Sequence, residues 1–281
     1  GSSMRAHGVP EQILTDNGKV FTGRFHAPPV EVLFDRICRE NGVEHLLTAP
    51  RSPTTTGKVE RFHRTLRLEF DTTQVFGSLA LAQGAAAVGS VQIRNLATVG
   101  GNVCNASPAA DTIPALLALN AQAELTGPSG QRTLPLDQFF SGPGQTVMQT
   151  GELLSGLTIP DLGDHVGSTY LRRCIRRQLD LAVVGVAAAI SLNDSGQITQ
   201  VRLALGAVAP TPIRAYAAEQ TILAAGGLND PILAEAAQLA QQAARPISDL
   251  RATAEYRRQM VGVLTRRALQ EAYRRAKGLF P

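Results

Sequence analysis

Two carboxylates near the N-terminus have neighbours that are typical of a catalytic metal site. Asp16 follows an apolar stretch in the segment TDNG, and Glu60 lies in the segment GKVERFHRTL, which predicts a helix. Enzymes that cut nucleic acid hold two divalent ions about 4 Å apart with several converging carboxylates. Asp16 and Glu60 are therefore candidate ligands of a nuclease-type site, but a first acidic ligand on an earlier strand has no counterpart in the chain.

A second candidate site surrounds Gly100 and Gly101 in the segment ATVGGN. Glycine permits positive φ, and successive backbone N–H groups can then point into one concavity and bind an anion such as a pyrophosphate. A lone glycine pair is also typical of a simple turn. The pair alone leaves both alternatives open.

An α/β pattern must position the two carboxylates. The segment QILTD predicts a strand, residues 29–41 predict a helix, and VEHLLTA predicts a second strand. Apolar residues at helical spacing from Val59 to Phe70 predict a further helix. Two strands cannot bury both faces of a sheet, so this part is expected to be a fragment of an α/β domain.

Helices and an antiparallel sheet must position the glycine pair. Helices are predicted at about residues 79–88 and in DTIPALLALN. Three strands predict a meander: STYLRRCIRR, LAVVGVAAAISL and ITQVRLALGAV. Three Ala-rich helices follow, the last over residues 249–276 with Ser248 or Asp249 as its N-cap. We expect the helices to cover the sheet and residues 167–276 to fold autonomously.

Composition and charge argue against several classes of protein. The net charge is only +4 and the basic excess follows Arg245, away from TDNG, so binding to nucleic acid is not favoured. The three cysteines lack C-x-x-C spacing, and no metal site is predicted. No apolar run reaches the roughly 18 residues of a membrane span, and no leader is visible. We expect a cytoplasmic protein, and we interpret residues 1–4 as an expression scar.

The segments ILTDNGKVFTG and LTAPRSPTTTGKVERFHRTL carry a first resemblance. They are similar to the catalytic core of insertion-sequence transposases, which has the retroviral-integrase, ribonuclease-H-like fold. By this resemblance Asp16 corresponds to the second acidic ligand of that family and Glu60 to the third. With the first ligand missing, we expect both to be vestigial. The alternatives are an Asp-Asn-Gly turn at Asp16 and a pairing of Glu60 with Arg64 across one helical turn.

Six segments between Ser78 and Ala276 carry a second resemblance: GSVQIRNLATVGGNVCNASPAADTIPALLAL, LPLDQFFSGPGQT, GELLSGLTIP, YLRRCIRRQLDLAVVGVAAAI, RLALGAVAPTPIRA and RPISDLRATAEYRRQMVGVLTRRAL. In this order they resemble the FAD-binding medium subunit of the molybdenum hydroxylases, the family of xanthine dehydrogenase and carbon monoxide dehydrogenase. The resemblance implies a flavoprotein that takes electrons from an iron–sulfur small subunit and passes them to an external acceptor. A molybdopterin large subunit would supply those electrons, and a homodimer of heterotrimers is one assembly it allows.

The same resemblance assigns eight residues to the cofactor. Five would hold the FAD pyrophosphate: Thr98, Val99, Gly100, Gly101 and Asn102. Asp111 would hydrogen-bond the cofactor, Leu154 would pack near the flavin ring or the adenine, and Arg172 would make a basic contact. The alternatives are that Asp111 caps the helix TIPALLALN, that Leu154 is a plain core residue, and that Arg172 is an exposed arginine on an edge strand.

These inferences combine into an α+β fold with three parts. Residues 5–70 are expected to be a partial ribonuclease-H-like α/β fragment, residues 71–164 the second half of an α/β FAD-binding domain, and residues 165–281 a three-stranded antiparallel sheet with a helical layer. The first glycine loop of the family would precede Leu79, where transposase-like sequence stands instead. We therefore expect a truncated flavin subunit, an oxidoreductase component whose retention of FAD is open. The alternatives are a transposase-derived DNA-binding fragment and a non-catalytic scaffold without FAD.

Overall fold

The chain consists of two compact units, Gly1–Val75 and Phe76–Pro281. The computed structural model describes residues 12–15, 31, 33–40, 42–47, 78–176 and 180–279. Asp16, Glu60 and the helix predicted from Val59 to Phe70 lie outside these residues.

The described part of the first unit is a β–α–β segment. Strand β1 (Gln12–Thr15) pairs in parallel with strand β2 (Glu44–Leu47). Helix α2 (Leu33–Glu40) lies between them in the chain, and Cys38 and Val43 are buried. Both predicted strands and the helix between them are confirmed, with the described helix beginning at Leu33.

The second unit is built around a four-stranded antiparallel sheet in the order β11–β10–β9–β8. Its strands are β8 (Val166–Arg173), β9 (Val184–Leu192), β10 (Ile198–Gly206) and β11 (Ile213–Arg214). The first three form the predicted meander. The predicted count of three strands is wrong, because the two-residue β11 adds to the edge of β10. A ladder this short leaves no periodic signal in the sequence.

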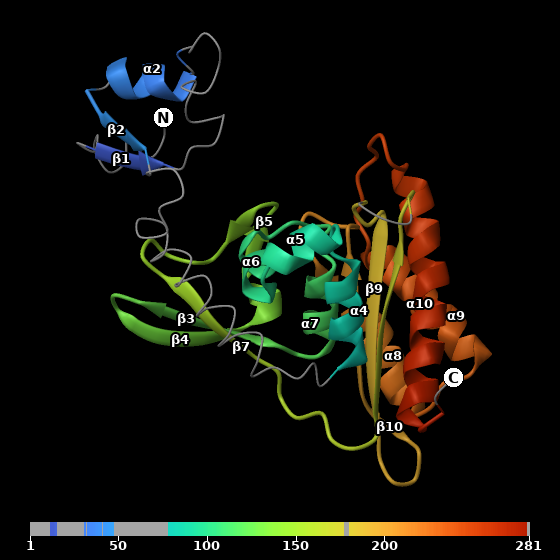
Figure 1. Ribbon diagram of the computed structural model, residues 1–281. Coiled ribbons are helices and arrows are strands. Elements are labelled where there is room, and N and C mark those ends of the chain that lie inside the picture. The colour runs from blue at the N-terminus through green and yellow to red at the C-terminus, as the bar shows by residue number, and fades with distance from the viewer. Residues whose placement is uncertain are drawn as a thin grey trace. The chain divides into compact units, whose positions relative to one another are not determined.

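Three helices cover one face of this sheet, as predicted (Figure 1). They are α8 (Tyr216–Ala225), α9 (Asp230–Ala243) and α10 (Ala254–Ala276). The even-numbered residues of β9 pack into the apolar core under these helices. Gly167 in β8 lets α10 approach the sheet, because a Cβ atom there would lie 1.9 Å from the carbonyl oxygen of Ala272.

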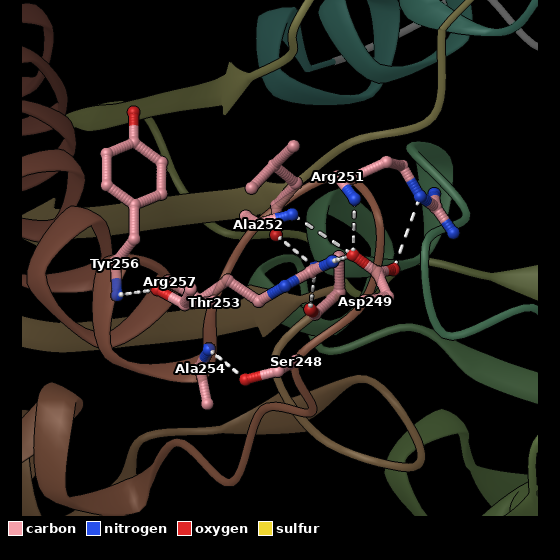
Figure 2. Close-up of polar contacts among 10 residues, drawn as sticks. Ser248, Asp249, Arg251, Ala252, Thr253, Ala254, Tyr256 and Arg257 are labelled. Carbon is pink, nitrogen blue, oxygen red and sulfur yellow. Dashed lines mark hydrogen bonds and ion pairs between the residues drawn. The ribbon is translucent and has the colours of Figure 1, made fainter.

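The predicted N-caps of the last helix, Ser248 and Asp249, are wrong. The N-cap is Thr253, whose hydroxyl accepts a hydrogen bond from the amide of Tyr256. Ser248 and Asp249 instead shape the loop that precedes the helix, where the Ser248 hydroxyl accepts from the amide of Ala254 (Figure 2). A cap-type residue binds any nearby free amide, so its identity alone does not fix where a helix begins.

The opposite face of the sheet is covered by helices α4 (Leu79–Ala87) and α7 (Thr112–Ala118), both predicted (Figure 1). Small residues allow this close packing: Ala187, Ala189 and Ala204 join the core on this side. The sheet is therefore buried on both faces. Residues 167–276 alone would expose this second face, which argues against the expected autonomous unit.

The remaining elements surround α7. Helices α5 (Val91–Leu96) and α6 (Val99–Cys104) precede it. A second sheet has the order β4–β3–β7, and its strands are β3 (Gln122–Gly127), β4 (Gly130–Pro135) and β7 (Leu153–Thr158). A short helix and a hairpin complete this part: η1 (Leu136–Gln138), β5 (Phe140–Gly142) and β6 (Gln145–Thr146). Among the helices that the structure describes, none has the length and apolar character needed to traverse a bilayer.

The contact between α10 and β8 predicts a specific sensitivity. Gly167→Ala should lower the free energy of unfolding by about 1–3 kcal/mol, because its new Cβ would collide with the backbone of α10. Gly227→Ala is the matched control, since a Cβ there meets no atom within 4 Å. Urea unfolding of both variants measures the difference. Equal stability of the two variants would contradict the described packing of α10.

Candidate functional site

A cavity of about 270 Å³ lies beside α6 and the start of α7. Its apolar walls include Val88, Ile93 and Leu181. Its polar lining residues come from three segments of the chain: Asn102, Asn105, Ser107, Asp111 and Asp180. The cavity therefore brings together two of the predicted cofactor residues, Asn102 and Asp111.

The glycine pair is helical, which corrects the predicted positive-φ loop. Gly100 and Gly101 lie in α6, and neither adopts positive φ. The hydroxyl of Thr98 caps this helix and accepts a hydrogen bond from the amide of Gly101 at 2.9 Å. The first-turn amides of Val99 and Gly100 have no carbonyl partner within the helix and face outward from its start. Glycine at 101 also leaves room for the cap, because a Cβ there would lie 2.9 Å from the Thr98 hydroxyl oxygen.

Asn102 joins the glycine pair to the cavity. Its Oδ1 atom accepts a hydrogen bond of 2.6 Å from the hydroxyl of Thr112, at the start of α7. This contact fixes the amide plane and leaves the Nδ2 group to donate elsewhere. Asn102 is therefore a donor held at the cavity wall by α7.

Asp111 is buried, and its carboxylate is held from two sides. The Tyr170 hydroxyl donates to Oδ1 at 2.7 Å, and Arg172 donates to Oδ2 at 2.8 Å. Burial raises the pKa of the Asp111 carboxyl, while the Tyr170 hydrogen bond and the Arg172 charge oppose this shift without cancelling it. Asp111 makes no capping hydrogen bond to α7. Asp111 thus occupies the N-cap position of α7, as the alternative expects, but its side chain does not cap the helix.

Arg172 contacts a residue that lines the cavity, whereas Leu154 packs against the core. Arg172 lies on the edge strand β8, but its side chain is only 17% exposed and pairs with Asp111. The alternative of an exposed arginine is wrong, since the guanidinium is committed to a buried carboxylate. Leu154 of β7 lies opposite Leu125 of β3 and packs against the core. It does not line the described cavity.

Tyr170 is the main residue that the sequence analysis missed. Burial and the Asp111 carboxylate raise the pKa of its hydroxyl well above the usual value, so it stays a hydrogen-bond donor at neutral pH. Its backbone amide donates to Gln83 of α4 at 2.9 Å. Gly185 on β9 makes room for the ring, since a Cβ there would lie 2.7 Å from the hydroxyl oxygen. A tyrosine in an apolar strand near a glycine of the next strand was the available signal.

Asp180 was missed as well, and it lines the cavity from a separate segment of the chain. Its carboxylate accepts hydrogen bonds from the amides of Arg176 and Ile175 at 2.8 and 2.9 Å. These hydrogen bonds hold the pKa of the Asp180 carboxyl below its usual range, and the bond from Arg176 has the largest effect. The cavity thus contains a carboxylate that remains ionised at neutral pH.

The donor and acceptor groups of the cavity determine which ligand chemistry it suits. The lining residues offer amides, one hydroxyl and two carboxylates, but no Arg or Lys side chain. Such a set suits the hydroxyl and amide groups of a polyol or heterocycle. The volume lies just below the roughly 300–1,000 Å³ of complete ligand pockets, so part of a cofactor fits here. Among the described residues, no group of three or more His, Cys, Asp or Glu side chains could hold a metal ion.

Two protein families match the chain. Residues 61–162 match the family described as the FAD-binding domain in molybdopterin dehydrogenase. Residues 169–272 match the family described as the carbon monoxide dehydrogenase flavoprotein C-terminal domain. The cavity residues lie within these two matches.

Curated relatives agree with the family matches. The xanthine dehydrogenase FAD-binding subunit of Escherichia coli O157:H7 is 36% identical over 200 residues, which are 71% of this chain and 68% of that protein. The carbon monoxide dehydrogenase medium chain of Afipia carboxidovorans is 36% identical over 187 residues, or 66% of this chain and 64% of that protein.

Solved structures of carbon monoxide dehydrogenase are also similar. Reconstituted carbon monoxide dehydrogenase from Oligotropha carboxidovorans matches 72% of this chain and 70% of that chain at 31% identity, with a TM-score of 0.66. The enzyme from Hydrogenophaga pseudoflava that lacks the molybdenum-pyranopterin moiety matches 97% of this chain and 93% of that chain at 26% identity, with a TM-score of 0.68.

The buried pair of Asp111 and Tyr170 predicts a pH-dependent effect. Tyr170→Phe removes a hydrogen bond that lowers the pKa of Asp111, so that pKa should rise further above its ordinary 3.8. An acid with a raised folded-state pKa stabilises the fold most below its unfolded pKa and loses that contribution as pH rises through the folded value. The variant should therefore lose about 1–3 kcal/mol at pH 7, and less near pH 4.

Urea unfolding across this pH range measures the effect. Tyr216→Phe is the control, because the Tyr216 hydroxyl also binds a carboxylate, that of Asp137, but its side chain is exposed. A loss in Tyr170→Phe that is the same at every pH would argue against the coupling to Asp111.

Proposed function

Because the chain belongs to the family of FAD-binding medium subunits of the xanthine and carbon monoxide dehydrogenases, we propose that it is a subunit of this kind and binds FAD. The observation that carries the proposal is the cavity that joins Asn102 to Asp111 inside the segment matched to the FAD-binding family. When bound, FAD would carry electrons from iron–sulfur clusters to an external acceptor. The protein would hold the cofactor in position and surround it with polar groups.

We propose distinct roles for the predicted cofactor residues. The amides of Val99 and Gly100 are suited to donate hydrogen bonds to a pyrophosphate oxygen at the start of α6, while Thr98 accepts from the amide of Gly101. Asn102 would donate to a polar group of the cofactor from the cavity wall. Asp111 would accept from a cofactor hydroxyl or ring N–H, the contact that best suits a carboxylate already held by two donors.

Two other predicted residues would act without lining the cavity. Arg172 would orient Asp111 by its 2.8 Å contact and would not bind the cofactor itself. Leu154 would support the cofactor domain through the core. These assignments divide the predicted set into contact residues and supporting residues.

We further propose that the chain assembles with a molybdopterin large subunit and an iron–sulfur small subunit in the cytoplasm, as a homodimer of heterotrimers. Apolar side chains at the cavity mouth and on neighbouring segments support a protein partner there: Leu181 is 52% exposed, Ile175 59% and Leu96 76%. Exposed apolar groups that gather near one site are typical of an interaction surface.

For residues 5–70 we propose descent from an integrase-core transposase with a ribonuclease-H-like fold. The motifs around Asp16 and Glu60 support this origin, as does the parallel pairing of β1 and β2 across α2. A competing hypothesis is that the segment now serves as the first lobe of the flavin domain. It is favoured by the structural likeness that extends over 97% of the chain.

The proposed cofactor site predicts the effect of one added charge. Asn102→Asp keeps the acceptor for Thr112 but places a carboxylate beside the proposed anionic cofactor. The dissociation constant for FAD should rise at least about tenfold, equivalent to about 1.4 kcal/mol. Asn193→Asp makes the same charge change in the remote turn between β9 and β10 and should bind like the parent.

Equilibrium dialysis with FAD and an absorbance spectrum of the purified protein measure the binding. The proposal fails if the parent chain shows no flavin band and takes up no FAD. Equal affinity of Asn102→Asp and the parent would show that the cofactor lies elsewhere.

The proposed origin of residues 5–70 predicts no residual transposase activity. Asp16 and Glu60 alone cannot bridge two metal ions, so terminal-repeat DNA with magnesium or manganese should stay intact. Gel electrophoresis of the incubated DNA tests this. Cleavage that disappears in Glu60→Gln would contradict the prediction.

A further inference from the structure

A partly buried hydrogen bond connects one wall of the cavity to the sheet. The carbonyl oxygen of Pro108 accepts a bond of 2.7 Å from the amide of Ala207, just after β10. Pro108 lies between Ser107 and Asp111, which both line the cavity. Ala207 adopts φ of 62°, a left-handed conformation that alanine avoids. Something must hold Ala207 in this strained conformation.

Arg257 of α10 holds Ala207 from the other side. Its Nη1 atom donates to the carbonyl oxygen of Ala207 at 3.0 Å and to that of Val183 at 2.7 Å. Val183 closely follows Asp180 and Leu181, which form a second wall of the cavity, separate in sequence from the wall of Ser107 and Asp111. One buried nitrogen therefore binds two backbone carbonyls, and each carbonyl is connected to a different wall.

Asp249 keeps the Arg257 guanidinium in place, as Figure 2 shows. Its Oδ1 atom accepts from Nη2 of Arg257 at 2.7 Å and from the amides of Arg251 and Ala252. Burial alone would raise the pKa of the Asp249 carboxyl, but these donors bring it to about 2. The carboxylate is therefore ionised at neutral pH and fixes the orientation of the Arg257 guanidinium.

The arrangement is costly for an ordinary core position. Arg257 is 3% exposed, and its Nε atom is buried with no hydrogen-bond partner. A buried guanidinium contributes little net stability compared with an apolar side chain of similar volume. Its distinctive property is the fixed geometry of its donors, which suits the positioning of two separate backbone segments.

We propose that Arg257 is a positioning residue for the cavity and sets the spacing of its two walls through Ala207 and Val183. The relevance to FAD rests on the proposed function, whereas the effect on the walls does not. Loss of the Arg257 guanidinium should allow Pro108 to move on one side of the cavity and the segment after Asp180 to move on the other. The affinity of the cavity for its ligand should then fall, although Arg257 does not contact the ligand.

The test compares two lysine variants of the full chain. Arg257→Lys keeps the charge but cannot reach all three acceptors in the same geometry. Arg275→Lys is the matched control: Arg275 is also a largely buried arginine of α10 that binds one backbone carbonyl, that of Ser168, and also has an unpartnered Nε. Asp249→Asn serves as a second test variant if Arg257→Lys does not fold.

Hydrogen exchange is measured first, without FAD, on the amides of Ala110 and Ala207. Both are hydrogen-bonded, to Ser107 and Pro108 respectively. Exchange should be about tenfold faster in Arg257→Lys and unchanged in Arg275→Lys. The dissociation constant for FAD, from equilibrium dialysis, should also rise about tenfold in Arg257→Lys alone.

The outcomes separate this proposal from the proposed function. Unchanged exchange in both Arg257→Lys and Asp249→Asn would overturn the positioning role, whatever FAD does. Faster exchange at the cavity wall with unchanged FAD affinity would also overturn it. If the parent protein binds no FAD, the proposed function fails, and the exchange experiment alone decides the role of Arg257.

Discussion

The rest of the second unit depends on the burial of its central sheet on both faces. Strand β9 is buried along its whole length, with even-numbered residues under α8–α10 and alanines under α7. Alanine and glycine are required on the α7 side of the sheet, because larger side chains would collide with the helix. At Gly206, for example, an added Cβ atom would lie only 2.7 Å from the Pro114 side chain. This close packing brings α7 against β8 to β10. The start of α7, with Asp111, therefore reaches the side chains that project from β8.

The polar groups of the site follow from that contact. An ionised carboxylate at the position of Asp111 would be very costly without partners, since the side chain is only 6% exposed. Strand β8 supplies both partners from alternate positions, Tyr170 and Arg172, which project from the same face of the strand. The loop between α6 and α7 is anchored by this carboxylate and by the hydrogen bond from Thr112 to Asn102 of α6. The cavity is the space that this anchored loop leaves against the segment of Asp180.

Local periodicity was sufficient to predict helices α2, α4 and α7–α10 and the three long strands, because apolar alternation and Ala-rich helical patterns survive in a single sequence. The glycine pair was predicted as a loop and is a helical turn, because the Thr98 cap and the packing against α7 outweigh the low helix propensity of glycine. The link between Asp111 and Tyr170 joins residues 59 apart in the chain, and no local pattern signals it. The family resemblance predicted Asp111 as a contact residue but could not show which groups hold it.

Buried arginine–carboxylate pairs recur where a helix or loop meets the sheet. Arg172 binds Asp111 before α7, and Arg257 binds Asp249 before α10. In a third pair, Arg214 with Glu219 of α8, the Glu219 carboxylate also accepts a hydrogen bond from the amide of Leu203 in β10. Apolar packing alone would tolerate small sliding movements of a helix over an alanine-rich face, since that face has few protruding side chains. A directional charged pair does not tolerate them. The small residues allow the layers to pack closely but do not fix their register, so the arginine–carboxylate pairs must fix it. The geometry of the cavity therefore depends on contacts that lie outside it.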